Sequence, residues 1–228
     1  LPTASLKSVL GDKIMNIYQD ENIKATITQI NMGPYSNNGY LVKCNETNEG
    51  IIIDTPAEPE KLIEEIEDTK IVAILITHGH QDHLLGFNEI TDATRAPVHC
   101  HQGDANLLPR TPDITVTDGQ KIPFGNLELT CIFTPGHTDG STCFLLGNHL
   151  FSGDTLFPGG PGKSRDPEAF QLEITSIKDK LLVLPPEVDV YPGHGGNTSI
   201  EESLEQFMIF ESKTHSPDLC GDVSWLNS

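Results

Sequence analysis

The chain has 228 residues, enough for one large domain or two small ones, and its apolar fraction of 36% suffices for a packed α/β core. No run approaches the roughly 18 consecutive apolar residues of a membrane-spanning helix, so no membrane partner is expected. The 33 acidic and 14 basic residues give a net charge of −19, which repels phosphate backbones and argues against a nucleic-acid partner.

The cysteines favour a reducing compartment. Five cysteines occur without a CxxC pair or a regular spacing, and such an odd count does not make a disulfide framework. The chain begins Leu1-Pro2-Thr3, without the basic and apolar stretches of a secretory signal. We therefore expect a cytoplasmic protein, and the sequence leaves its oligomeric state open.

The first half of the chain contains short apolar strands around one acidic helix. Strands are predicted over residues 23–30, 40–44, 51–53 and 71–76. A turn at Asn37-Asn38-Gly39 is expected before the second strand, and residues 59–67 show the periodicity of a helix. The strand over residues 71–76 is apolar throughout, which is typical of a strand covered on both faces.

The second half continues the same alternation. Strands are predicted over residues 98–100, 114–116, 127–133, 142–146, 149–151 and 188–191. Helices are predicted over 84–90, from Asp166 to about residue 182, and after a capping box at residues 198–201. Because no Ser- or Gly-rich linker interrupts the pattern, we expect one α/β domain over residues 1–228, with helices on both faces of the sheets.

Four predicted strands end in residues that commonly bind metals. Three of them run through a glycine-containing turn into histidine, at His78-Gly79-His80, Gly136-His137 and Gly193-His194. The fourth ends in Gly153-Asp154 and delivers a carboxylate in the same way. Glycine permits the close backbone approach that lets several strand ends aim their side chains at one point.

The first of these clusters has the spacing of two neighbouring metal sites. His78 and His80 are two residues apart, so an extended segment turns both rings to one side, whereas Asp82 and His83 lie on the following turn. Imidazole and carboxylate ligands suit Zn, Fe or Mn. Two ions about 3.5–4 Å apart need a bridging ligand, for which Asp154 is suited. We therefore predict two divalent metal ions, with Zn favoured and Fe or Mn as alternatives.

The segment His78-Gly79-His80-Gln81-Asp82-His83 resembles the HxHxDH signature of the metallo-β-lactamase superfamily. Gly136-His137, Gly153-Asp154 and Gly193-His194 match its later ligand motifs in order. The resemblance implies an αββα sandwich with the metals at one edge between two sheets. It also implies that the first metal is held by His78, His80 and His137, and that the second metal is held by Asp82, His83 and His194. Asp154 would then bridge the two metals, and Asp54 would support the ligands without binding a metal itself.

Within the superfamily the chain is similar to glyoxalase II-type thioester hydrolases. The segment from Phe157 to Lys163 resembles the stretch after the bridging Asp of glyoxalase II, where a lysine contacts the glutathione carboxylate. We therefore expect Lys163, helped by Arg165, to bind a small anionic substrate. Gly196 stands where that family has an aromatic residue, so the use of glutathione thioesters is left open.

The predicted function is that of a binuclear metal-dependent hydrolase, acting on a thioester, lactone or other ester through a metal-bridging hydroxide. Asp82 is also a candidate for proton transfer to the leaving group. The alternative is a mononuclear iron persulfide dioxygenase, whose family shares HxHxDH. A third alternative is a metal-binding module without turnover, which a broken ligand set would favour. All seven ligand positions are intact in this chain.

Overall fold

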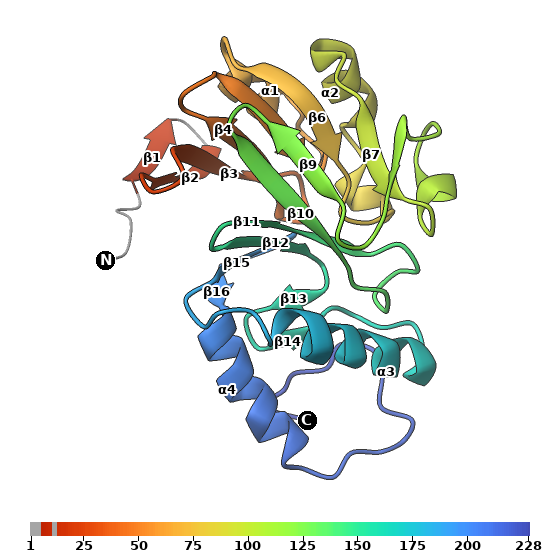
Figure 1. The fold of residues 1–228 in the computed structure, drawn as a ribbon. Helices are drawn as coiled ribbons and strands as arrows, with labels where there is room; N and C mark the ends of the chain where they lie inside the picture. Colours follow the sequence, from red (N-terminus) through yellow and green to blue (C-terminus); the bar gives the residue numbers. More distant parts are fainter. Residues whose placement is uncertain (1–5, 11–12) are drawn as a thin grey trace.

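Two mixed β-sheets lie face to face at the centre of the molecule in the computed structural model, which describes residues 6–10 and 13–228 (Figure 1). The first sheet has the strand order β1-β2-β3-β4-β5-β6-β7-β8. Its strands are β1 (Leu6–Leu10), β2 (Lys13–Asp20), β3 (Ala25–Met32), β4 (Asn37–Cys44), β5 (Glu49–Ile53), β6 (Lys70–Leu75), β7 (Val98–His101) and β8 (Ile114–Val116).

The second sheet has the order β16-β15-β12-β11-β10-β9. Its strands are β9 (Lys121–Phe124), β10 (Leu127–Phe133), β11 (Thr142–Leu146), β12 (His149–Gly153), β15 (Asp189–Pro192) and β16 (Thr198–Ser199). A short hairpin of β13 (Leu156–Phe157) and β14 (Gly160–Pro161) follows β12. Strands β5 and β6 run parallel in the first sheet, as do β12 and β15 in the second.

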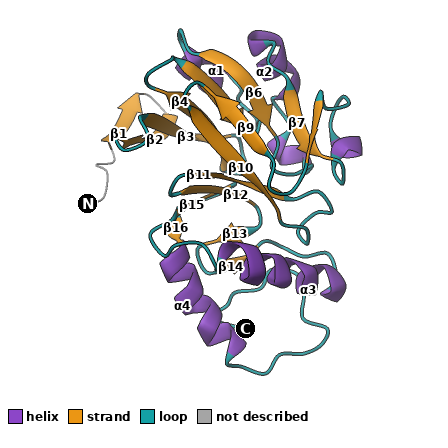
Figure 2. Ribbon diagram, in the orientation of Figure 1, coloured by secondary structure: helices purple, strands orange, loops and turns teal. Residues whose placement is uncertain are grey.

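Helices cover the outer face of each sheet (Figure 2). The first sheet carries α1 (Glu60–Ile66) and α2 (Phe87–Thr94), with the short 3-10 turns η1 (Gln81–His83) and η2 (Ala105–Leu107). The second carries α3 (Pro167–Ser176), its π-helical extension η3 (Ile177–Leu181), and α4 (Ile200–Glu211). The arrangement confirms the predicted αββα sandwich.

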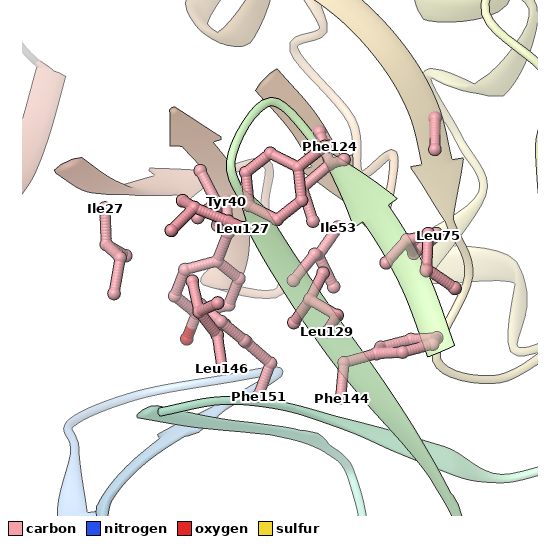
Figure 3. Packing of buried hydrophobic residues seen from close by; sticks show 14 of the residues in the cluster. Ile27, Tyr40, Ile53, Leu75, Phe124, Leu127, Leu129, Phe144, Leu146 and Phe151 are labelled. Carbon is pink, nitrogen blue, oxygen red and sulfur yellow. The ribbon is translucent and has the colours of Figure 1, made fainter. Parts of the chain in front are cut away.

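The sheets are held together by apolar side chains that meet between them (Figure 3). Ile53 and Leu75 of the first sheet pack in one cluster with Leu129, Phe144 and Phe151 of the second. A second cluster lies under α1 and α2, and a third lies under α3 and α4. Because the first sheet is covered on both faces, the buried ends of its neighbouring strands β5 and β6 are apolar on both sides, as the segment over residues 71–76 indicated.

Three local expectations were incomplete or wrong. The hairpin β1–β2 and the strand β9 were not predicted. β9 contains Pro123, which argues against a strand in the sequence, but β9 lies at the edge of its sheet, where proline is tolerated. The expected turn at Asn37-Asn38-Gly39 is wrong, because these residues begin β4 and the chain turns earlier, where the Ser36 N–H bonds the Gly33 carbonyl. The capping box expected at residues 198–201 is displaced by one residue, because Ser199 caps the last helix and accepts a hydrogen bond from the Glu202 N–H.

No helix within residues 6–10 and 13–228 is long and apolar enough to cross a membrane.

Candidate metal centre

The first histidine cluster joins the end of β6 to the loop after β10. The His80 Nδ1 atom lies 3.1 Å from His78 Nε2 and 2.9 Å from His137 Nε2. One ligand atom from each of the three rings can be chosen so that all lie within 4.8 Å of one another. His78 is buried and His80 is exposed, so the cluster lies at the surface end of the sandwich.

The second cluster combines η1 with His194, the second residue after β15. The His194 Nε2 atom lies 3.2 Å from both Asp82 Oδ2 and His83 Nε2. His194 can reach the second cluster because Gly193, the residue before it, has no side chain. A Cβ atom on residue 193 would lie only 2.2 Å from Asp154 Oδ1. The strand-glycine-histidine pattern in the sequence therefore has a steric cause at this position.

Asp154, directly after β12, lies between the two clusters. Its Oδ1 is 3.3 Å from His83 Nε2, and its Oδ2 is 3.4 Å from His194 Nε2 and 3.7 Å from His137 Nε2. Oδ1 is buried and has no hydrogen-bond partner among the described residues. A buried carboxylate oxygen in this state is well suited to bind a cation.

The donor set fits two divalent metal ions. Neighbouring ring nitrogens of His78, His80 and His137 lie at hydrogen-bond distance from one another. If all of these nitrogens carried protons, the N–H groups would point at each other, so some of them must present a lone pair. Each cluster supplies three imidazole or carboxylate donors, which is the chemistry of Zn or Fe sites. The structure thus brings together all seven residues that the sequence suggested as ligands.

The carboxylates give the centre a strong affinity for positive charge. Burial lowers the pKa of His194, but hydrogen bonds to Asp154 and Asp82 outweigh it and raise the pKa to about 10. Burial also opposes the charged form of His83, whose pKa is nevertheless raised well above its usual value by the carboxylates of Asp154 and Asp54. A metal cation would compete with these protons, so its binding should weaken as the pH falls.

Asp54 braces the second cluster from the end of β5. Its Oδ2 lies 2.9 Å from His83 Nδ1 and accepts a hydrogen bond of 2.7 Å from the Thr77 hydroxyl. Its Oδ1 accepts a bond from the Thr77 N–H at 2.8 Å. Asp54 holds a left-handed backbone conformation with φ of 58°, which non-glycine residues adopt at a cost. This is the supporting position that the resemblance implied.

Backbone and hydroxyl oxygens orient three further rings. The Nδ1 atoms of His137 and His194 each lie 3.0 Å from a carbonyl oxygen, of Lys163 and Tyr35 respectively. The Nδ1 atom of His78 lies 3.0 Å from the Thr77 hydroxyl oxygen. An Nδ1–H bonded in this way leaves the Nε2 lone pair directed at the centre.

A cavity of about 410 Å³ opens beside the centre. It is lined by His137, Asp154, Phe157, Pro158, Gly159, Gly160, Pro161, Gly162, Lys163, His194, Asp222, Val223 and Ser224. Its volume lies in the range of small-molecule sites, which is roughly 300–1,000 Å³. The segment from Phe157 to Lys163 therefore forms one wall of the cavity, next to the predicted ligands.

The structure separates the two cations that were expected to act together. Lys163 lines the cavity and has no carboxylate within 4.0 Å among the described residues. The Arg165 guanidinium instead forms ion pairs of 2.8 Å with Asp139 and 3.3 Å with Asp166, and it does not line the cavity. Of these two cations, Lys163 alone lines the cavity.

Asn37 is a functional candidate that the sequence analysis did not identify. It is buried, and its Nδ2 donates to Asp82 Oδ2 at 2.8 Å and lies 3.4 Å from His194 Nε2. Its backbone pairs with that of His194 across the two sheets. The Asn-Asn-Gly sequence was interpreted as a turn, and this local interpretation concealed the contact with Asp82.

The C-terminal segment extends the wall that the segment from Phe157 to Lys163 forms. Gly221 pairs with Ser164, and the Trp225 N–H bonds the Gly159 carbonyl at 2.9 Å. The Trp225 ring is fully buried in the cluster under α3 and α4, which fixes Asp222 and its neighbours in the lining of the cavity. No motif in the sequence indicates this role.

A buried carboxyl group lies behind the centre on α3. Glu173 has no exposed surface, and neither of its oxygens has a hydrogen-bond partner in the described structure. Burial, together with the nearby negative charge of Asp154, raises the pKa of Glu173 to about 9. The side chain is therefore neutral in the folded protein at physiological pH.

We expect Glu173→Gln to stabilise the protein increasingly as the pH rises from 5 to 9. Between the ordinary pKa of 4.5 and the folded value of about 9, only the folded state keeps the proton, so the wild type loses stability with increasing pH. The amide does not titrate. The unfolding free energy of Glu173→Gln minus that of the wild type should therefore grow by up to about 1.4 kcal/mol per pH unit.

Thermal unfolding of chelator-treated protein across this range measures the difference. Glu168→Gln, which changes an exposed carboxyl group at the start of the same helix, is the matched control. Parallel pH profiles of wild type and Glu173→Gln would contradict the neutral buried carboxyl.

Comparison with known proteins places these features in a family. A sequence profile of the metallo-beta-lactamase superfamily matches residues 32–194. The chain is 30% identical to the probable polyketide biosynthesis zinc-dependent hydrolase BaeB of Bacillus velezensis, over 76% of this chain and 80% of that protein. It is 39% identical to a hydroxyacylglutathione hydrolase of Rhodospirillum rubrum, over 68% of this chain but only 60% of that enzyme.

A solved structure gives the corresponding match in three dimensions. TTHA1623 in a di-iron-bound form superposes with a TM-score of 0.68 at 32% sequence identity. The match covers 77% of this chain and 96% of that one.

Proposed function

The chain belongs to the metallo-beta-lactamase superfamily, and from this premise we propose that it is a binuclear metal-dependent hydrolase of a carboxyl thioester, lactone or other ester. The observation that carries the proposal is the pair of three-residue clusters that share Asp154. The relatives named as hydrolases support the same reaction class.

In this proposal His78, His80 and His137 hold one ion, Asp82, His83 and His194 hold the other, and Asp154 contacts both. Divalent ions bound there supply Lewis acidity, which activates water near neutral pH and polarises a carbonyl group. We propose Zn, which the zinc-dependent relative supports, with Fe or Mn as alternatives and Fe supported by the di-iron form of TTHA1623.

The protein's own groups would orient the reaction. Asp54 and the carbonyls of Lys163 and Tyr35 fix the rings, so the ligands need little rearrangement during the reaction. Asp82 is about one-quarter exposed, and although burial raises the pKa of its carboxyl group, hydrogen bonds from His194 and Asn37 outweigh it and hold the pKa well below its usual value. We propose that this ionised carboxylate takes up the proton that the attacking water loses and passes it to the leaving group. Lys163 would bind an anionic part of a small substrate.

Metal analysis and two activity assays test the proposal. The expected result is two ions per chain, together with thioester or lactone hydrolysis that a chelator abolishes and Zn or Mn restores. One iron per chain, with oxygen uptake on a persulfide that far exceeds any hydrolysis, would establish the persulfide dioxygenase instead. Metal binding without either activity would support the binding module.

We further propose that residues 1–228 act as one domain in a reducing cytoplasm. The core between the sheets joins both halves of the described chain, and all five cysteines are free thiols.

Lys163→Ala is expected to raise KM for an anionic substrate about tenfold at nearly unchanged kcat, which is roughly 1.4 kcal/mol of binding. A charge contact present in both the substrate complex and the transition state lowers KM without raising kcat. Raised salt should weaken the same contact, because counterions screen the attraction between Lys163 and the anion.

Arg165→Ala is the matched control, since it removes the same charge from a residue paired with Asp139 outside the cavity. Steady-state kinetics on an anionic substrate and its esterified analogue separates the local contact from the general field. Equal KM values for both substrates, unchanged by Lys163→Ala, would remove Lys163 from the binding site.

A further inference from the structure

A buried carboxylate joins the two loops that carry the first metal cluster. Asp104 lies between β7 and η2 and is 1% exposed. Its Oδ2 accepts hydrogen bonds of 2.7 Å from the Gly79 N–H and from the Thr138 hydroxyl. Its Oδ1 accepts a bond of 2.8 Å from the Gly140 N–H. One side chain therefore binds both loops through three hydrogen bonds.

These bonds lie next to every residue of the first cluster. Gly79 stands between His78 and His80, and Thr138 directly follows His137. The Thr138 hydroxyl also lies 2.7 Å from the Ser141 hydroxyl, which accepts the Thr138 N–H at 3.0 Å. The loop after His137 is thus closed on itself and tied to the loop after β6 through Asp104.

The contact leaves no space for the loops to approach differently. A Cβ atom at Gly140 would lie 2.5 Å from the Asp104 nitrogen and 2.6 Å from its carboxyl carbon. A Cβ atom at Gly79 would lie 3.2 Å from the Asp104 Cβ and 2.7 Å from Leu107. The position of Asp104 therefore sets the separation of the two loops.

The other buried carboxylate near the centre, Asp54, contacts His83 of the second cluster directly and reaches His78 of the first cluster through Thr77. We propose that Asp104 is a positioning residue of the first metal site, and that it sets the affinity of that site alone. The inference rests on the proposed two-metal centre and adds a buried carboxylate that acts on only one of its two sites. Residues that orient metal ligands typically contribute about 10- to 100-fold to affinity.

The test is cobalt titration of Asp104→Asn, followed by visible absorption and by competition with a chelator. We expect one of the two ions to bind about 10- to 100-fold more weakly and the other to keep its affinity. His137→Ala and His194→Ala provide reference spectra for loss of the first and the second site. At one equivalent of cobalt, the visible spectrum of Asp104→Asn should resemble that of His137→Ala and differ from that of His194→Ala.

Asp113→Asn is the matched control, because Asp113 also accepts a backbone N–H bond, from Val98 at 2.8 Å, but contacts neither ligand loop. Thr138→Val removes one of the three bonds and should weaken the same ion if Asp104→Asn does not fold. The site of Asp104→Asn should refill at high cobalt concentration, which a collapsed loop would not allow.

Equal weakening of both ions, or no weakening relative to Asp113→Asn, would overturn the positioning role. A wild type that saturates at one ion would instead contradict the binuclear centre. In that case the difference between Asp104→Asn and Asp113→Asn still decides whether Asp104 positions the first cluster. The two failures are therefore distinguishable.

Discussion

Replacing Asp154 by alanine is expected to remove more than one of the two metal equivalents and to lower kcat/KM by about 10³-fold or more, at least about 4 kcal/mol of transition-state stabilisation. Its two carboxylate oxygens lie within 4.0 Å of nitrogens from both clusters. Removing the side chain would therefore take a ligand from each of the two proposed ions, and it leaves four imidazoles without the carboxylate that attracts a cation.

Elemental analysis of wild type and variant, treated side by side with excess Zn and then desalted, measures the loss. Asp222→Ala is the matched control, because it removes a carboxylate from the same cavity that belongs to neither cluster. A variant that retains both ions would show that Asp154 does not join the sites, and a wild type with one ion would overturn the binuclear assignment.

Replacing His83 by alanine is expected to lower kcat by about 10³-fold while KM changes by less than about threefold. His83 is fully buried between Asp54 and Asp154, and its Nε2 faces His194 and Asp82. Its loss should empty the second site and leave the first. An ion that acts mainly on the transition state contributes to kcat more than to substrate binding.

Steady-state kinetics with a thioester substrate, together with metal content, tests this expectation. His101→Ala is the control, since this ring stacks on Phe133 and lies outside both clusters. A raised KM at unchanged kcat would assign the second site to substrate binding. Because His83 is buried, thermal unfolding of the metal-free variant must show that the fold persists before the kinetics are interpreted.

The sequence was sufficient for one α/β domain, and its resemblance to the superfamily was sufficient for the sandwich and for the proximity of the seven ligand candidates. Apolar strands followed by a glycine turn and a histidine or aspartate are local patterns, and their period and length are set by the chain itself. β6 of the first sheet and β15 of the second lead into loops that meet at one edge of the sandwich, so residues as far apart in the chain as His83 and His194 lie in contact there. Asp54 was inferred from the resemblance to the superfamily, which has an Asp at this position.

Only the tertiary structure decided which other residues support the site. Asp104 reaches residues that are 25, 34 and 36 positions away, and Asn37 reaches Asp82 across 45 positions. Contacts between residues this far apart in the chain produce no periodic pattern in the sequence, because they depend on how the two sheets and their loops pack. The same is true of Arg165, whose distant partner Asp139 turns it from the cavity, and of the wall fixed by Trp225. Local sequence determined the metal donors, whereas long-range packing determined what orients them and what encloses the substrate.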